Sequence, residues 1–402
     1  MYICQIVFDK KYASVYISYM LFKSAQLGDA EFGVIEKIEV ARKQLKYNLA
    51  TPRTWKGLLR RNTFARAIRG SNSIEGYNVT AEDAIAAAQG EEPMDASRDA
   101  WLAVTGYRTA MTFVLQLAKD PNFQYSEGFI RGLHFMMIQH DLGKNPGNWR
   151  PGTIYVRDEA KNQIVYEGPD VELVPALINE LVRYLNEFEC PHILIKGAMA
   201  HLNLAMIHPF SDGNGRMARC LQTLVLAKEG ILESEFCSIE EYLGRNTQAY
   251  YNVLAETGQG SWHPQNDTRA WLRFNLTAHY RQATTLLMRS RAMGMLWEEL
   301  EAIISSVSLP GRVIYAIADA AIGYKVRNSS YRGIAEINDI TASRDLRAAV
   351  QANLLKADGE RRGRTYVASP EIRDVFLRIR ADQIKPIPDP FVEETQELLF
   401  RG

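Results

Sequence analysis

The sequence predicts a mainly α-helical protein that carries one β-hairpin and a small C-terminal winged-helix domain. Three observations predict this class. Apolar residues recur at three- and four-residue intervals along most of the chain, one β-favouring segment interrupts them, and the C-terminal part combines helices with two short strands. Because 402 residues are too many for one ordinary globular domain, we expect several structural units.

The composition indicates a folded protein of ordinary polarity. Hydrophobic residues make up 47% of the chain and charged residues 23%, which excludes extended disorder. Lysine and arginine together number 47, as do aspartate and glutamate, so a uniformly basic coat for nucleic acid is excluded. No apolar segment is long enough to span a bilayer, and no segment has the pattern of a signal peptide. The four cysteines lack CxxC spacing, and we therefore expect a cytoplasmic protein with no membrane partner.

The helical spacing is nearly continuous up to the C-terminal part. It covers residues 34–49, 62–69, 101–119, 126–139, 171–188, 193–207, 216–228 and 268–294. Thr80 and Asp83 have the spacing of a capping box that opens one more helix. Residues 1–25 show no clear pattern and stay unassigned.

A β-favouring segment interrupts the helices. Residues 152–157 and 163–167 are rich in β-branched and aromatic side chains, and they flank a polar turn at 158–162. The pattern predicts a lone hairpin in a helical protein. Because two strands are marginally stable by themselves, this hairpin must pack on another element or hold a partner.

The segment His208–Arg219, HPFSDGNGRMAR, carries the strongest chemical signal. Its glycines and asparagine at residues 213–215 favour a tight turn before the helix that begins near Arg216. Backbone amides at such a turn, together with the helix dipole, form an anion site. The segment 213–218 also fits the dinucleotide pattern GxGxxA, but a helix precedes it where that pattern needs a strand. No phosphate-binding P-loop motif occurs, and the remaining alternative is a loop that only joins two helices.

Four side chains around this turn have complementary chemistry. Arg216 and Arg219 are three residues apart on the first helical turn, so both can point toward the anion. Asp212 offers a hard oxygen ligand of the kind that Mg²⁺ takes together with phosphate oxygens. His208 can accept a proton near neutral pH. The combination predicts nucleotide-dependent group transfer.

The same segment resembles the signature of the Fic family, HxFx[D/E]GNGRxxR, and fills every signature position. The resemblance extends over about residues 59–289. It implies a Fic-type helical bundle with the hairpin as a flap. It also implies a protein adenylyltransferase, which moves AMP from ATP to a Ser, Thr or Tyr hydroxyl of a target protein.

Roles follow from the resemblance position by position. His208 would deprotonate the target hydroxyl, and Asp212 would hold Mg²⁺, with ATP as co-substrate. The stretch 245–251 resembles one that lines the nucleotide end of the site. The nucleotide-binding residues implied in this way are Gly213, Asn214, Gly215, Arg216, Arg219 and Tyr251.

A second match lies upstream. Residues Ser71 to Gly76, SNSIEG, resemble the family's inhibitory motif [S/T]xxxE[G/N]. The resemblance implies that Glu75 pairs with Arg219 and displaces the γ-phosphate. The alternative is an ordinary helix C-terminus that ends in Glu-Gly.

The hairpin occupies the place of the family's flap, which binds a target segment by strand addition. The flap residues implied by the resemblance are Thr153, Ile154, Tyr155 and Val156. The alternative is an ordinary surface hairpin.

The C-terminal part is locally basic. Residues 311–370 contain ten Lys or Arg and six Asp or Glu. Arg344 and Arg347 would lie on the recognition helix of a winged helix, and Arg361, Arg362 and Arg364 in its wing. DNA binding is one interpretation, and dimerisation or target docking is the other.

The predicted organisation has five parts. They are an N-terminal segment (1–58), helices with the inhibitory motif (59–120), a Fic catalytic core (121–295), a winged helix-turn-helix (305–370) and a tail (371–402). The expected partners are ATP and a hydroxyl-bearing target protein. Modification of the protein itself, DNA binding and pairing with a second copy of the chain stay open. Three functional alternatives also stay open: another donor, removal of AMP, or a DNA-binding regulator whose Fic unit senses nucleotide.

Overall fold

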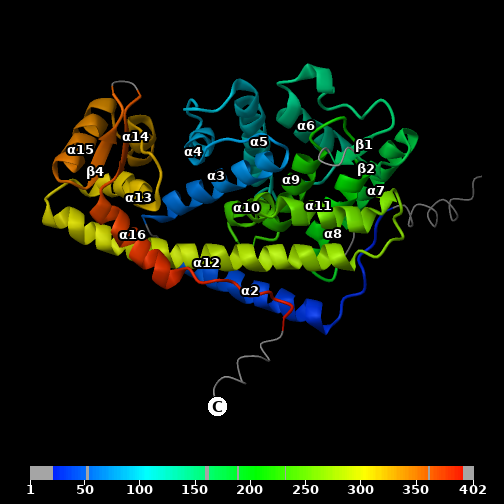
Figure 1. Ribbon diagram of the computed structural model, residues 1–402. Helices are drawn as coiled ribbons and strands as arrows, with labels where there is room; N and C mark the ends of the chain where they lie inside the picture. Colours follow the sequence, from blue (N-terminus) through cyan, green and yellow to red (C-terminus); the bar gives the residue numbers. More distant parts are fainter. Residues whose placement is uncertain are drawn as a thin grey trace, which may run out of the picture. The chain divides into compact units, whose positions relative to one another are not determined.

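A computed structural model describes residues 21–50, 54–158, 163–187, 190–230, 232–360 and 363–392. These residues contain fifteen α-helices and five short strands, joined by loops and short 3-10 helices (Figure 1). The mainly α fold class is therefore confirmed. The unassigned residues 1–20 and the end of the expected tail, 393–402, lie outside the described part.

The chain divides into two compact units. Unit 1 comprises Met1–Gly33, Gly106–Gly230 and Arg245–Ala278, and unit 2 comprises Val34–Thr105, Ile231–Gly244 and His279–Gly402. Both units are built from segments that are far apart in the sequence. Three helices run from one range into the other: α2 (Asp29–Ala50), α5 (Arg98–Leu117) and α12 (Arg269–Ser306).

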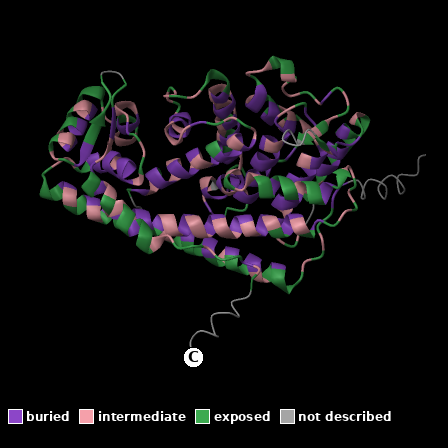
Figure 2. Cartoon of the chain, in the orientation of Figure 1, coloured by how far each residue is buried: buried purple, intermediate pink, exposed green. Residues whose placement is uncertain are grey.

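Two adjacent, deeply buried helices form the centre of unit 1. They are α8 (Ile193–Ile207), whose bounds agree with the sequence prediction, and α9 (Asn214–Ala227). Figure 2 shows both helices coloured almost entirely as buried. Trp271 is fully buried and donates its indole N–H to the carbonyl of Ala198 at 2.8 Å, which ties α12 to α8. The other helices of this unit are α6 (Glu127–Ile138), η1 (Leu142–Lys144), η2 (Val171–Leu173), α7 (Val174–Glu187) and α11 (Thr247–Gly258).

The predicted hairpin is present, but the prediction that it stands alone is wrong. Strands β1 (Tyr155–Asp158) and β2 (Gln163–Glu167) pair antiparallel, and β3 (Gly260–Ser261) adds a parallel neighbour to β2. A two-residue strand carries no periodic pattern, so the sequence does not reveal it. The hairpin packs on the helices through Tyr166, whose hydroxyl donates to the Met206 carbonyl of α8 at 2.9 Å.

Unit 2 combines helices from both ends of the chain. An ion pair at 2.6 Å between Arg289 of α12 and the buried Glu241 joins the C-terminal range of this unit to its middle range. A capping hydrogen bond from the Asp83 N–H to the Thr80 hydroxyl opens α4, as the sequence predicts. The remaining elements of this unit are α3 (Lys56–Ile74), α4 (Ala81–Gln89), η3 (Ser234–Phe236), α10 (Glu240–Arg245), η4 (Gly311–Val313), α13 (Ile314–Ile322), α14 (Asn328–Ala335), α15 (Asp339–Gln351), β4 (Leu355–Asp358), β5 (Thr365–Ala368) and α16 (Pro370–Gln383).

The C-terminal part of unit 2 has three helices followed by a two-stranded hairpin, in the order α13, α14, α15, β4, β5. This order contains the helices and the hairpin that the sequence predicts, while the winged-helix assignment stays a prediction. Helix α16 takes up the first part of the segment expected as a tail, and Arg373 on it donates to the Ala321 carbonyl at 2.6 Å. Arg361 and Arg362 of the expected wing lie outside the described residues.

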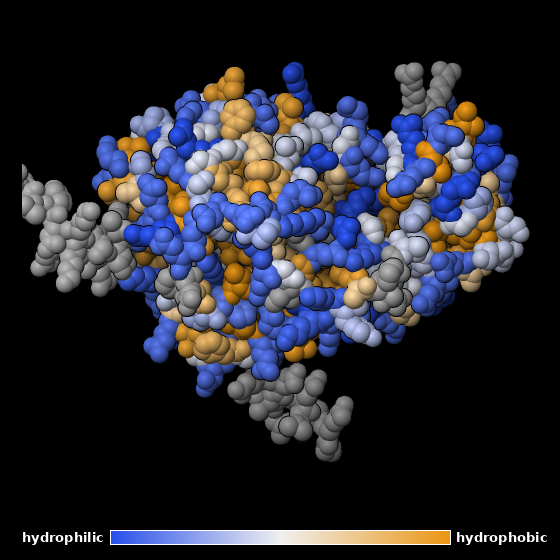
Figure 3. Space-filling view, turned by 180° about the vertical axis from the view of Figure 1, so that it is seen from behind, coloured by the Kyte–Doolittle hydropathy of each residue, from blue (hydrophilic) through white to orange (hydrophobic). Residues whose placement is uncertain are grey.

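The face drawn in Figure 3 is mixed, with hydrophilic residues next to apolar ones. Among the described helices, none combines the length and the hydrophobicity that a bilayer crossing requires. The cysteines in the described part, Cys190, Cys220 and Cys237, are free thiols.

Helices α3 and α10 approach each other at two glycines. A Cβ atom added to Gly70 would lie 2.9 Å from the carbonyl carbon of Glu240, and one added to Gly244 would lie 2.7 Å from Cα of Gly70. The neighbouring atoms belong to the backbone, so they cannot turn aside as a flexible side chain would. This contact lies directly before the last turn of α3, which ends at Ile74 within the SNSIEG segment.

We predict that Gly70→Ala lowers the free energy of unfolding of unit 2 by about 1–3 kcal/mol, because the methyl group overpacks a backbone contact. Gly57→Ala is the matched control: Gly57 lies on the same helix with no atom within 4 Å of an added Cβ, so the alanine is neutral or slightly stabilising. Urea unfolding followed by circular dichroism measures both. Equal midpoints for the two variants would contradict the close approach.

Candidate functional site

The signature segment forms a backbone reversal between α8 and α9. His208 ends α8 in the left-handed conformation with φ 50°, and its N–H donates to the Leu204 carbonyl at 3.2 Å. Gly213 opens α9, also left-handed, with φ 79°. A Cβ on Gly213 would lie 2.9 Å from Cδ1 of Ile138, so glycine meets both a conformational and a steric requirement here.

The imidazole of His208 is held in one tautomer. Its Nδ1 lies 3.1 Å from the carbonyl oxygen of Ala205. Because a carbonyl can only accept, Nδ1 carries a proton, so the neutral ring has its lone pair on Nε2. The side chain therefore presents a basic nitrogen, as a general base must.

Asn214 fixes the turn with its side chain. The Phe210 N–H donates to Asn214 Oδ1 at 2.9 Å, and Asn214 Nδ2 donates back to the Phe210 carbonyl at 2.8 Å. The Asn214 side chain thereby holds the loop closed in front of α9, and its amide oxygen and one of its two amide N–H groups are used within the loop. The first N–H groups of α9, which have no acceptor within the helix, can bind an anion.

Both signature arginines are buried. Arg216 is 0% exposed and Arg219 is 2% exposed. Arg216 Nη2 lies 3.5 Å from the Asp212 carboxylate, and the Arg219 guanidinium lies 6.0 Å from the centre of the Tyr250 ring. Guanidinium groups form strong, charge-assisted hydrogen bonds with phosphate oxygens. Two of them on the first turns of α9 can therefore contribute to an anion site at the start of this helix.

Asp212 is suited to hold a metal ion together with phosphate oxygens. Burial alone would raise its pKa, but the hydrogen bond from Lys144 at 2.6 Å and the charge of Arg216 outweigh that effect and hold the pKa below its usual range. No group of three or more His, Cys, Asp or Glu side chains suited to a metal occurs within the described ranges. A single ionised carboxylate beside an anion site fits Mg²⁺ that takes its other ligands from phosphate and water.

Sequence reasoning missed His134, a buried residue of α6. Its ring stacks on Phe210 with centroids 3.7 Å apart, and Nδ1 accepts from the Gly147 N–H at 2.8 Å. Nε2 lies 3.0 Å from the Asp212 carbonyl, which it meets as a donor. Burial lowers the pKa of His134 to about 4, so the ring is neutral and supports the loop from one side.

Sequence reasoning also missed Arg150, which is 2% exposed. Its Nε donates to the His208 carbonyl at 3.0 Å and its Nη1 to the Gly152 carbonyl at 2.5 Å, while Nη2 donates to the Pro169 carbonyl. Gly152 precedes the hairpin and Pro169 follows it. One guanidinium therefore joins both ends of the hairpin to the backbone of His208.

Tyr251 and the predicted flap residues belong to unit 1. Tyr251 is 42% exposed on α11, with its ring 5.5 Å from that of buried Tyr250. Thr153 and Ile154 precede β1 rather than lying in it, whereas Tyr155 and Val156 are in the strand.

The predicted inhibitory residues belong to unit 2. Ser71 is buried in the last turns of α3, and Glu75 is the residue that caps this helix. Gly76 follows with φ 83°, as expected of a glycine that stops a helix.

This geometry agrees with a comparison against protein families. Residues 124–226 match the Fic/DOC family. They form a Fic domain. The match contains α8, the turn and nearly all of α9, together with the hairpin.

Curated relatives of the Fic domain carry consistent names. The chain is 31% identical over 96 residues to the probable protein adenylyltransferase aq_aa38 of Aquifex aeolicus (strain VF5), covering 24% of this chain and 28% of that protein. It is 27% identical over 178 residues to protein adenylyltransferase Fic of Aedes aegypti, covering 42% of this chain and 31% of that protein. The chain thus spans less than a third of the length of each.

Solved structures share the fold beyond the Fic domain. A Fic family protein from Desulfovibrio desulfuricans G20 aligns with a TM-score of 0.55 at 21% identity, over 87% of this chain and 99% of that one. A Fic domain containing signaling protein from Bacteroides thetaiotaomicron VPI-5482 aligns with a TM-score of 0.50 at 22% identity, over 63% and 97%.

We predict that unit 1 loses stability as the pH falls from about 7 to about 5.5. Burial lowers the pKa of His201 to about 3 and that of His134 to about 4, while the pKa of a histidine in the unfolded chain is about 6.5. The unfolded chain therefore binds more protons in this window. Stability is fully present above about pH 6.5 and is lost toward the folded pKa values, by about 1 kcal/mol for each ring at pH 5.5.

Thermal unfolding at the two pH values measures this loss. His201→Gln should show a smaller pH dependence of stability than the wild type. An unchanged dependence in His201→Gln would contradict the assignment.

We predict that Arg150→Lys loosens the hairpin, because one ammonium group cannot reach three separate carbonyls. Amides of residues 154–158 and 163–168 should exchange with deuterium at least about tenfold faster, which corresponds to about 1.4 kcal/mol. Arg157→Lys, at an exposed position within β1, is the control and should leave exchange unchanged. Identical protection in both variants would mean that the guanidinium does not hold the hairpin.

Proposed function

We propose that the Fic domain transfers AMP from ATP to a Ser, Thr or Tyr hydroxyl of a target protein. The proposal rests above all on one observation: the short segment 208–219 brings together an imidazole whose Nδ1 faces a carbonyl, the N-terminus of α9 and two buried arginines. The names of the curated relatives, protein adenylyltransferases, support the same activity.

In the proposed reaction the target hydroxyl oxygen attacks the α-phosphorus of ATP while its proton passes to Nε2 of His208. The bond between the α-phosphorus and the oxygen that bridges to the β-phosphate breaks, and that oxygen leaves with the electron pair in pyrophosphate. The products are AMP-modified protein, pyrophosphate and a proton on His208, which solvent removes. Positioning and charge stabilisation supply most of the rate of such a transfer.

The chain's own charges would hold the phosphates. Arg216 and the first amides of α9 would bind the α- and β-phosphates, and Arg219 the γ-phosphate. When bound through Asp212, Mg²⁺ would neutralise phosphate charge and stabilise the leaving pyrophosphate. Lys144, whose ammonium group contacts the same carboxylate, would have to yield that oxygen to the metal.

The edge strand β1 would hold the target. In the sheet order β1-β2-β3, the outer edge of β1 faces away from β2, and Tyr155 on it is 46% exposed. An extended target segment could add to this edge through main-chain hydrogen bonds and present its hydroxyl to His208. Tyr251, on α11, would contact the nucleotide.

Inhibition by Glu75 is part of the proposal. A carboxylate that pairs with Arg219 would exclude the γ-phosphate, so ATP would bind without productive geometry. The support comes from the SNSIEG motif and from the position of Glu75 at the end of α3. We place the reaction in the cytoplasm, where thiols stay reduced.

The test is transfer of label from α-³²P-ATP with Mg²⁺ to protein, using the full chain with and without cell extract. We expect weak labelling by the wild type and stronger labelling by Glu75→Gly, because the γ-phosphate site is then open. Labelling by Glu75→Gly/His208→Ala should be at least about 10²-fold weaker than labelling by Glu75→Gly, because the double variant lacks the base.

Asn78→Gly is the control for the first change. It introduces the same residue into the same segment at an exposed position. If labelling rises equally in Asn78→Gly, inhibition by Glu75 is refuted. Absence of label in all proteins, with ATP still bound and the fold intact, would overturn AMP transfer in favour of another donor or of AMP removal.

A further inference from the structure

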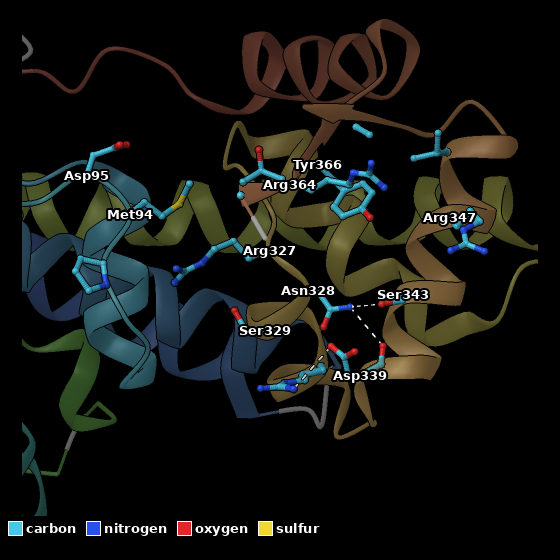
Figure 4. Close-up of a pocket in the computed structure, with 16 residues that line it drawn as sticks. Met94, Asp95, Arg327, Asn328, Ser329, Asp339, Ser343, Arg347, Arg364 and Tyr366 are labelled. Carbon is cyan, nitrogen blue, oxygen red and sulfur yellow. Dashed lines mark hydrogen bonds and ion pairs between the residues drawn. The ribbon is translucent and has the colours of Figure 1, made fainter. Parts of the chain in front are cut away.

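A cavity of about 960 Å³ lies in unit 2, between the loop that follows α4 and the C-terminal helices and hairpin. Four arginines from three separate segments line it: Arg327, Arg332, Arg347 and Arg364. Figure 4 shows Arg327 extending toward Met94, while Arg347 comes from α15 and Arg364 from the hairpin. Serine, asparagine, threonine and tyrosine side chains fill much of the remaining wall, which also contains the carboxylates of Asp95 and Asp339. Pockets for small molecules are mostly apolar, so this lining indicates a different class of ligand.

Two of these arginines already have acidic neighbours. Arg327 pairs with Glu91 at 2.8 Å, and Arg332 lies 3.9 Å from Asp339. Arg347 and Arg364 are exposed and form no ion pair with any residue that the structure describes. The open part of the cavity therefore carries positive charge from α15 and from the hairpin.

Helix α15 is anchored by one face and presents the other. Its inner face carries Leu346 and Asp345, whose carboxylate binds Arg312 at 2.7 Å and the Tyr331 hydroxyl at 3.0 Å. Its outer face carries Ile340, Arg344, Arg347 and Gln351, all exposed and spaced by three or four residues. A rigid helix with two basic residues on its exposed stripe has the width that the major groove of DNA admits.

We propose that this surface, formed by α15, the start of α14 and the β4–β5 hairpin, binds double-stranded DNA. Guanidinium groups on three segments around one open cavity suit a polymer with regularly spaced phosphates better than a single small anion. Helix α15 would enter the major groove through Arg344 and Arg347. Arg327 and Arg364 would contact the phosphates on either side.

An internal carboxylate already occupies one of these phosphate positions. Glu91 Oε2 accepts hydrogen bonds from Arg327 at 2.8 Å, from the Ser329 hydroxyl at 2.9 Å and from the Ser330 hydroxyl at 3.0 Å. All three donors lie at or just before the first turn of α14, where a phosphate oxygen would find the same partners. Glu91 therefore competes with DNA for Arg327 and lowers the affinity.

The test is fluorescence anisotropy with the full chain and a labelled duplex of about 30 base pairs, over a salt series from about 50 mM. We expect the wild type to bind at low salt. Arg347→Ala and Arg364→Ala should each weaken binding by about threefold to tenfold and reduce the slope of log K against log salt by about 1. Arg380→Ala, which removes an exposed positive charge from α16, is the matched control and should bind as the wild type does.

A second pair of variants tests the role of Glu91. Glu91→Gln should tighten binding several-fold because Arg327 becomes available, whereas Glu92→Gln removes the same charge from the next residue and should change affinity less. Absence of binding by both the wild type and Glu91→Gln at low salt would overturn the proposal. Equal weakening by Arg347→Ala and Arg380→Ala would also overturn it, since the attraction would then be that of net charge. No step of this test involves ATP or His208, so its outcome is independent of the AMP-transfer assay.

Discussion

The backbone reversal between α8 and α9 is the constraint on which the functional part of the structure depends. Two left-handed residues, His208 and Gly213, bracket it, and for histidine that conformation costs about 1–3 kcal/mol. The strain persists because both flanking helices are buried almost throughout and cannot adjust. The tautomer of His208, the direction of the first amides of α9 and the burial of two arginines all follow from this one turn.

Much of the fold could be predicted from local patterns. The bounds of α8 agree with the prediction, and the Thr80 cap lies where its sequence signal places it. Helix α9 begins at Asn214, two residues earlier than the apolar spacing indicates, because Gly213 can take the left-handed cap. Strand β3 could not be predicted, since two residues that pair across a long sequence separation leave no periodic signal.

The site divides in the same way. Residues 208–219 carry their chemistry in a contiguous motif, so their roles could be proposed from the sequence alone. His134, Lys144 and Arg150 come from segments 58 or more residues upstream of His208 and act through backbone carbonyls and one carboxylate. No local pattern shows that a charged side chain will be buried against such partners, because the tertiary fold creates the environment.

The guanidinium of Arg150 gives the hairpin and the base a common support. In the proposed reaction, a target segment lies along β1 while its hydroxyl reaches His208, so the fit of the segment and the placement of the base are mechanically linked. A segment that pairs poorly with the edge strand would then lose turnover as well as affinity. Selection among hydroxyl groups would follow the extended shape of the surrounding backbone more than the identity of neighbouring side chains.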